Sequence, residues 1–253
     1  MATSSSDRRA AVDKIRRDAQ RADQRQGRII ILLSVLAALV IIGIPAVPII
    51  KGMLDTNSVA KLNLSAIGAK ASVCGSRILS PGTGTQQHVD PGTPVDYSAE
   101  ASPPAFGQHE VYPDPIKRKM YTEIDRPRVA QLVHNLEHGY TIVWYDSTIA
   151  DDSAAMTDLK GIADKFQGED DFRKKLKIVP WLKTDGKPFP KGQHVAITHW
   201  AKEAAKADAA AAKKAKVTAD AGVWQYCSEV SGQALQEFMT AYPYLNSPEP
   251  TAG

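Results

Sequence analysis

The sequence predicts an α+β fold, in which a single N-terminal transmembrane helix precedes one small extracytoplasmic domain with a mixed sheet. An uncharged apolar run covers residues 29–50. After it, amphipathic helical patterns alternate with short runs of β-branched and aromatic residues, in the order helix, strand, helix, strand, strand, helix. That order is typical of one small α+β domain. The chain has 253 residues, which is enough for one sizeable core.

The apolar run at 29–50 is long enough to anchor the chain in a membrane. As a helix, its 22 residues would span about 33 Å, and the hydrocarbon layer is about 30 Å thick. A cleaved signal peptide would have an apolar region of only about 7–15 residues, and no good small-residue cleavage site follows this one. We therefore expect an uncleaved, single-pass anchor in the plasma membrane, with the lipid bilayer as its partner.

Charge is distributed unevenly around this run. Residues 1–28 carry eight Lys or Arg and four Asp. An excess of positive charge before a membrane helix places the N-terminus in the cytoplasm, beside anionic lipid headgroups. Residues 52–253 carry 22 basic and 24 acidic side chains, a balance that argues against nucleic-acid binding. The sequence thus predicts a basic cytoplasmic tail at 1–28 and a domain on the outer side.

Composition divides the outer part further. A spacer at 51–73 leads into the α+β domain at 74–246, in which residues 201–221 form an insertion rich in Ala and Lys. Residues 203–216 within it are almost only Ala, Lys and Asp, so we expect a helix-prone, solvated segment without a large apolar face. A Pro-rich tail follows at 247–253.

The two cysteines, Cys74 and Cys227, both lie on the predicted outer side. In an oxidising compartment an even pair predicts a disulfide. It would close a loop of roughly 150 residues, worth about 4–5 kcal/mol in the chain-entropy description. Ligation of copper or zinc by these sulfurs is the alternative, although the two are far apart and neither has a neighbouring His or Cys.

Hydrophobic periodicity places each element of the domain. Apolar residues at i, i+3, i+4 and i+7 predict helices, and β-branched or aromatic runs between turn signals predict strands. Asp125 and Ser153 are the expected caps of the first two helices, and Pro127 is the expected first residue of the first helix. The expected elements are a helix at 127–138, a strand at 141–145, a helix at 153–166, strands at 176–182 and 194–200, and a helix at 223–242.

The densest group of metal-ligating side chains lies at the end of the first helix. In a helix, His134 and His138 share one face with Cβ atoms about 6 Å apart, so both can reach one metal ion. Glu137 flanks the same face, and Gly139 follows as a helix stop. The run therefore predicts a polar site at the junction of this helix and the next strand.

A metal site is the leading functional hypothesis. His109, which follows a Gly turn, and His88 are expected to complete the ligand shell. Imidazole nitrogens suit copper and zinc. Glu137 is expected either to bind directly or to orient a ligand. His194 and His199 lie in a strand pattern and are expected to be structural or surface residues.

Two other interpretations stay open. The spacing His134-x-x-Glu137-His138 matches the H-x-x-E-H motif of inverted zinc peptidases, but that motif belongs inside a long helix, and Gly139 follows at once. Alternatively, the histidines only fix loops to the sheet, as imidazoles at a helix C-terminus can. The protein would then be a structural or interaction module of the cell envelope, with other envelope proteins as partners. Because no nucleophile, phosphate loop or cofactor motif is evident, we favour metal transport, storage or delivery over catalysis.

These residues also resemble a known family. The pattern of His88, Pro103-Pro104, Gly107-x-His109, Tyr121 and the run at 133–140 closely resembles the bacterial domain-of-unknown-function family 3105. The resemblance covers roughly Cys74 to the last helix, and its most specific part is the run His-Asn-Leu-Glu-His-Gly. It implies a single-pass or secreted bacterial protein, in agreement with the anchor, but no firm activity.

The chain departs from the family's pattern at one place. Where the family usually has Pro-Pro-Thr-Ser-Gly-Pro-His, residues 103–109 read Pro-Pro-Ala-Phe-Gly-Gln-His. The glycine and the histidine are kept, whereas both hydroxyls are lost. This chain therefore has no counterpart of the family's two hydroxyls, while the proposal for the imidazole stands.

Overall fold

The computed structural model describes residues 59–82 and 87–252. The predicted tail at 1–28, the predicted anchor at 29–50 and the first part of the spacer lie outside these residues. Within the part that the structure describes, no helix is long and apolar enough to cross a membrane.

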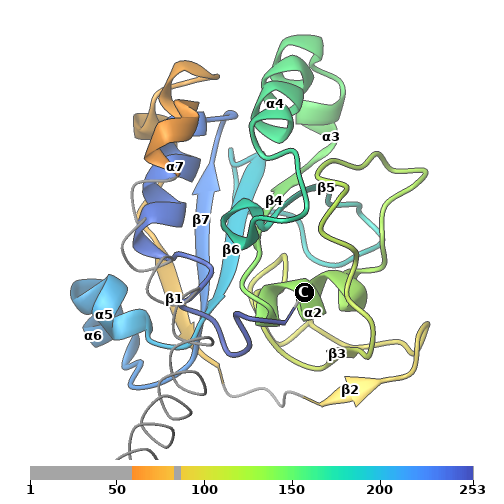
Figure 1. Cartoon of the computed structure of the whole chain (residues 1–253), viewed down its shortest axis with the longest axis vertical. Helices are drawn as coiled ribbons and strands as arrows, with labels where there is room; N and C mark the ends of the chain where they lie inside the picture. The colour runs from red at the N-terminus through yellow and green to blue at the C-terminus, as the bar shows by residue number, and fades with distance from the viewer. Residues whose placement is uncertain (1–58, 83–86, 253) are drawn as a thin grey trace, which may run out of the picture. The chain divides into compact units, whose positions relative to one another are not determined.

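A five-stranded mixed sheet forms the centre of the fold (Figure 1). Neighbouring strands pair antiparallel, except that β4 and β5 run parallel. The expected mixed sheet and α+β class are therefore confirmed. In spatial order the strands are β1 (Ile78–Pro81), β7 (Ala221–Cys227), β6 (Val195–Ala201), β4 (Thr141–Tyr145) and β5 (Leu176–Pro180).

A second, two-stranded ribbon lies apart from the main sheet. In it, β2 (His88–Val89) pairs parallel with β3 (His109–Glu110). The helices are α2 (Val129–Glu137), α3 (Ser147–Ala150), α4 (Ser153–Lys165), α5 (Ala204–Ala207), α6 (Ala209–Ala215) and α7 (Gly232–Ala241). Within residues 59–82 and 87–252, 3-10 turns lie at Ala60–Leu62, Leu64–Ala66 and Ala71–Val73, before β1, and at Phe172–Lys174.

Helices cover both faces of the main sheet. Strand side chains alternate between faces, and in β4 Val143 and Tyr145 join one apolar cluster whereas Ile142 and Trp144 join another. The first cluster also contains the buried apolar side chains of α4 and α7, and the second contains Leu132, Val133 and Leu136 of α2. Because both faces are buried, the strands are apolar almost throughout, as is usual for a sheet between two helical layers.

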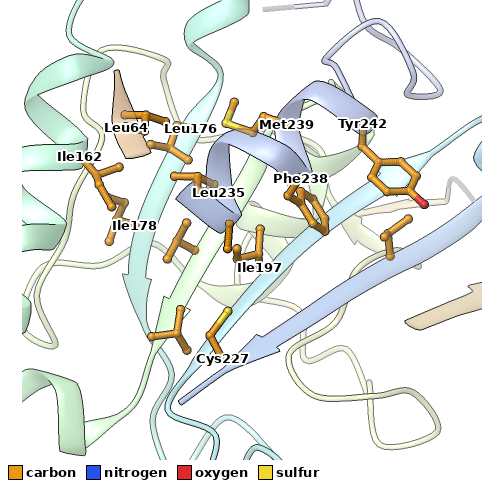
Figure 2. Packing of buried hydrophobic residues seen from close by; sticks show 14 of the residues in the cluster. Leu64, Ile162, Leu176, Ile178, Ile197, Cys227, Leu235, Phe238, Met239 and Tyr242 are labelled. Atoms are coloured by element: carbon orange, nitrogen blue, oxygen red, sulfur yellow. The ribbon is translucent and has the colours of Figure 1, made fainter. Parts of the chain in front are cut away.

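The core under α7 is well filled. Figure 2 shows Leu235 and Phe238 of α7 pointing toward the strands, with Ile197 of β6 and Ile178 of β5 beneath them. Each of these four side chains is at most 2% exposed. Complete burial of such a side chain contributes about 1.5–3 kcal/mol, so each of these four residues stabilises the fold.

The last predicted helix is wrong in its first half. Residues 221–227 form strand β7 in the interior of the sheet, and a helix begins only at Gly232. Trp224 and Cys227 therefore lie on a strand. The expected helical stripe arose because a strand buried on both faces shows no two-residue polar period.

Two predicted helix caps are also wrong. Asp125 instead accepts hydrogen bonds from the backbone N–H and hydroxyl of Thr122, in a turn before the helix. The first residue of α2 is Val129 rather than Pro127. In α4, Asp152 is the cap, because its side chain accepts from two backbone N–H groups of the first turn, and Ser153 is the first helical residue.

The insertion at 201–221, which is rich in Ala and Lys, is partly buried. The segment expected to be solvated forms α5 and α6, and its Ala204 and Ala212 are buried, with α6 packed beside β1. Small alanines suffice for this contact, so a large apolar face is not required.

Cys74 and Cys227 form the predicted disulfide, which links the segment before β1 to the end of β7.

Candidate metal centre

Two histidines face each other across the short ribbon. In its register, His88 lies opposite His109. Gly107 precedes β3 with a φ of +117°, a left-handed conformation that glycine adopts at little cost. The carbonyl oxygen of this glycine accepts a hydrogen bond of 2.8 Å from Nδ1 of His109. The glycine turn therefore fixes the orientation of the His109 ring.

Helix α2 supplies the third histidine and a carboxylate. Nδ1 of His134 lies 2.5 Å from the carbonyl oxygen of Glu110, a contact that joins α2 to β3. The centroids of the three imidazole rings are 4.7–4.9 Å apart. One ligating atom from each of four residues lies within 4.8 Å of the others: His88, His109, His134 and Glu137.

Backbone carbonyls determine which nitrogen of two rings carries the proton. A carbonyl oxygen only accepts, so Nδ1 is the donor in both His109 and His134. In the neutral rings, Nε2 then keeps its lone pair. Metal-binding histidines are commonly held in this way, with one nitrogen donating to a carbonyl and the other free to ligate.

Several buried atoms of the cluster have no hydrogen-bond partner among the described residues: Nε2 of His109, both carboxylate oxygens of Glu137 and Nδ1 of His138. Nε2 of His109 lies 3.0 Å from Oε2 of Glu137, yet the pair lacks hydrogen-bond geometry. Both side chains are fully buried. Because an unsatisfied buried polar group costs about 1–3 kcal/mol, this cost indicates that a cation or a proton belongs between them.

The electrostatics favour a cation. Burial by itself would raise the pKa of Glu137, but the neighbouring imidazoles outweigh it, and the net shift lowers the pKa. Burial and the adjacent imidazoles of His109 and His88 lower the pKa of His134. At neutral pH the cluster therefore combines a charged carboxylate with a neutral imidazole, which is the protonation state that a metal ion requires.

The fourth histidine, His138, lies beside this group. Its Nε2 is 2.9 Å from Nε2 of His134. Burial, followed by the nearby charges of His134 and Lys175, lowers the pKa of His138 to about 4. His138 forms a second candidate group with Glu137 and Glu249, whose ligating atoms also lie within 4.8 Å of one another.

The C-terminal segment returns to the site. The backbone N–H of Glu249 donates to the carbonyl oxygen of Glu137 at 3.0 Å. Nζ of Lys175 donates to the carbonyls of His138, Pro250 and Ala252. This buried lysine thus fastens the tail to the end of α2. Sequence reasoning missed Glu249, because nothing local in a Pro-rich tail indicates where it folds back.

Two further polar contacts join β3 and the loop after it to α2 and the residue that precedes this helix. The side-chain amide of Asn135 pairs with both backbone groups of Asp114. Glu110 accepts two hydrogen bonds from the guanidinium of Arg128, at 2.5 and 2.7 Å. These contacts position the cluster without belonging to it. Only the position of Asn135 between His134 and Leu136, inside the motif, could have indicated its role.

The structure therefore brings together most of the predicted site residues. His88, His109, His134 and Glu137 meet in one group, and His138 adjoins it. The other two histidines lie outside the cluster: His199 is in β6, and His194 directly precedes this strand. His194 contacts the carboxylate of Asp146, and His199 bonds backbone carbonyls at both ring nitrogens.

The end of α2 bears on the peptidase interpretation. The helix ends at Glu137, and Gly139 has a φ of +88°. A Cβ at Gly139 would lie 2.3 Å from the carbonyl oxygen of Tyr244. The motif therefore sits at a sharp helix end beside the C-terminal segment, and not within a long helix as in the inverted zinc peptidases.

Comparison with known proteins places the chain in a family. A family model described as "Protein of unknown function (DUF3105)" matches residues 88–253. The matched range contains the ligating residues of both candidate groups. Neither a search of curated proteins nor a search of solved structures gives a match. Since the family model covers about two thirds of the sequence, the chain belongs to this family of unknown function, DUF3105.

Proposed function

We propose that this protein binds a transition metal ion, copper or zinc, through His88, His109, His134 and Glu137. The observation that carries the proposal is the meeting of Nε2 of His109 with the Glu137 carboxylate, buried and without hydrogen bonds among the described residues. Three imidazoles and one carboxylate are a common ligand set for these metals. Bonds of about 2 Å to a tetrahedral ion place ligands about 3.3 Å apart, so only a small contraction of the group is needed.

Exposure of one ligand suggests how the ion exchanges. The side chain of His88 is 40% exposed, whereas those of His109 and Glu137 are fully buried. An ion arriving from solvent would meet His88 first and then the inner ligands. Such a site suits transport, storage or delivery of an ion better than catalysis.

Anchoring in the plasma membrane belongs to the same proposal. The apolar run at 29–50 and the basic residues before it support a single-pass protein with this domain outside. The disulfide between Cys74 and Cys227 fits an oxidising compartment. The metal site would then act at the outer face of the membrane, where other envelope proteins are available as donors or acceptors of the ion.

Titration of the full-length protein in detergent tests metal binding. Cu(I), Cu(II) and Zn(II) are each added to wild type, to His109→Ala/His134→Ala and to His194→Ala, which removes a histidine outside the cluster. Micromolar or tighter binding that is lost only in the double variant supports the proposal. Weak binding that is equal in all three proteins contradicts it.

A structural module without a metal is the second candidate. It is favoured by the hydrogen bond from His134 to Glu110, which ties the ribbon to α2, and by the one from His109 to Gly107, which fixes the turn before β3. On this account, alanine at either histidine lowers the free energy of unfolding, and added metal raises it in no variant. A metal-dependent rise in wild type alone would exclude this candidate.

A further inference from the structure

We propose that the site holds two metal ions and that Glu137 bridges them, with His138 and Glu249 as the remaining protein ligands of the second ion. This inference rests on the proposed function. It assigns Glu249, which lies in the C-terminal segment, as a metal ligand.

The first argument is the way the ligands divide. They form two groups, His88, His109, His134 and Glu137 on one side, and Glu137, His138 and Glu249 on the other. Glu137 is the one residue common to both. Four imidazoles and two carboxylates are more ligands than a single tetrahedral ion takes, whereas two ions that share a carboxylate would use all of them.

The second argument is the state of the Glu137 carboxylate. Its side chain is fully buried, and both of its oxygens lack a hydrogen-bond partner among the described residues. An ion bound at one oxygen would leave the other unsatisfied. A bridging carboxylate gives each oxygen an ion, as in sites where two metals lie about 3.5–4 Å apart.

The third argument is that His138 and Glu249 are already held beside the bridge. Nε2 of His138 lies 3.6 Å from Oε2 of Glu249, and only 7% of the His138 side chain is exposed. The backbone N–H of Glu249 donates to the carbonyl of Glu137, and Lys175 donates hydrogen bonds to two carbonyls of the C-terminal segment. These bonds keep the Glu249 carboxylate at the end of α2. Binding of the two ions would replace the contact between the Nε2 atoms of His134 and His138.

The two subsites differ in their contact with solvent. The Glu249 side chain is 51% exposed, so water can complete the shell of the second ion. The first ion would be held by three imidazoles and the bridge. We therefore expect the first ion to bind more tightly, and the second to exchange more readily.

Counting ions in the full-length, detergent-solubilised protein tests the inference. Wild type, Glu249→Gln, Glu249→Ala and the exposed control Glu229→Gln are equilibrated with Zn(II), and protein-bound zinc is measured after removal of free metal. We expect two ions per chain in wild type and in the control, and one ion in both Glu249 variants. One ion per chain in wild type, unchanged by substitution of Glu249, overturns the second subsite and leaves the proposed function intact. Absence of bound zinc in all four proteins, with the same result for copper, overturns both.

Copper offers a second readout. Two Cu(II) ions bridged by a carboxylate couple magnetically, so the wild-type protein should show less EPR intensity than its copper content implies. Glu249→Gln should restore one full mononuclear signal per bound copper. A full signal in wild type, with the intensity of two independent ions, would overturn the bridge.

Discussion

Replacement of Glu137 by Gln separates the metal-site account from the structural one. In the metal-free protein, the Glu137 carboxylate faces Nε2 of His109 at 3.0 Å, and neither group is exposed. An amide of the same shape can donate an N–H to that nitrogen and carries no charge to desolvate. Removing an unsatisfied buried group relieves about 1–3 kcal/mol. The metal-free variant should therefore be more stable than wild type by about that amount.

The size of the effect is within reach of thermal or denaturant unfolding. In a domain of this size, about 1 kcal/mol shifts Tm by roughly 2–4 °C, so Glu137→Gln should raise the Tm of the metal-free protein by roughly 2–12 °C. The same variant should lose the stabilisation that zinc or copper gives wild type, about 2.7 kcal/mol when free metal is a hundred times Kd.

Unfolding is measured in chelator and again in excess metal, with Glu229→Gln as the exposed control. A loss of 2 kcal/mol or more in the metal-free Glu137→Gln protein would refute this reasoning. It would mean that the contact between Glu137 and His109 stabilises the metal-free fold.

Three further predictions concern stability. Cys74→Ser/Cys227→Ser removes a link across 153 positions, and should lower the free energy of unfolding by up to about 5 kcal/mol; an unchanged denaturant midpoint would contradict this. Gly139→Ala places a Cβ against the carbonyl of Tyr244 in a left-handed backbone conformation, and should cost more than about 1 kcal/mol, with faster hydrogen exchange in the C-terminal segment; wild-type exchange there would count against the contact. The pKa of His138 is about 4 in the folded chain, against an ordinary 6.5. Between these two pH values the unfolded chain binds a proton at His138 that the folded chain does not bind. The free energy of unfolding of the metal-free protein should therefore fall by at most about 3 kcal/mol as the pH drops from 6.5 to 4. His138→Gln should flatten that part of the profile, and an equally steep profile in this variant would show that other groups cause it.

Local patterns predicted the parts of the site that are local. His134, Glu137 and His138 lie within five positions, and helical spacing alone places them on one face. Gly139 marked the end of that helix correctly, because its left-handed conformation is one that glycine adopts readily. The short connection into β4 followed from the same stretch.

The return of the C-terminal segment to the site could not be read from the sequence. Glu249 reaches the site because Lys175, more than seventy positions earlier, binds the carbonyls of Pro250 and Ala252. A lysine just before a strand is ordinarily expected at the surface, yet Lys175 is fully buried. Its role depends on the tertiary fold, and no periodicity indicates it.

The error at 223–242 has a different origin. β7 lies between β1 and β6 and is buried on both faces. Apolar residues at almost every position, such as Trp224 and Cys227, match a buried strand and a helical stripe about equally well. The last five residues of strand β7, 223–227, and the helix that follows were therefore merged into one longer helix.

X-ray absorption at the zinc edge of the full-length protein loaded with one equivalent of Zn(II) tests the central claim most directly. The account predicts a first shell that includes three imidazole nitrogens at about 2.0 Å and one carboxylate oxygen, with the imidazole count reduced in His109→Ala. A shell of oxygen atoms alone, identical in wild type and in that variant, would contradict it.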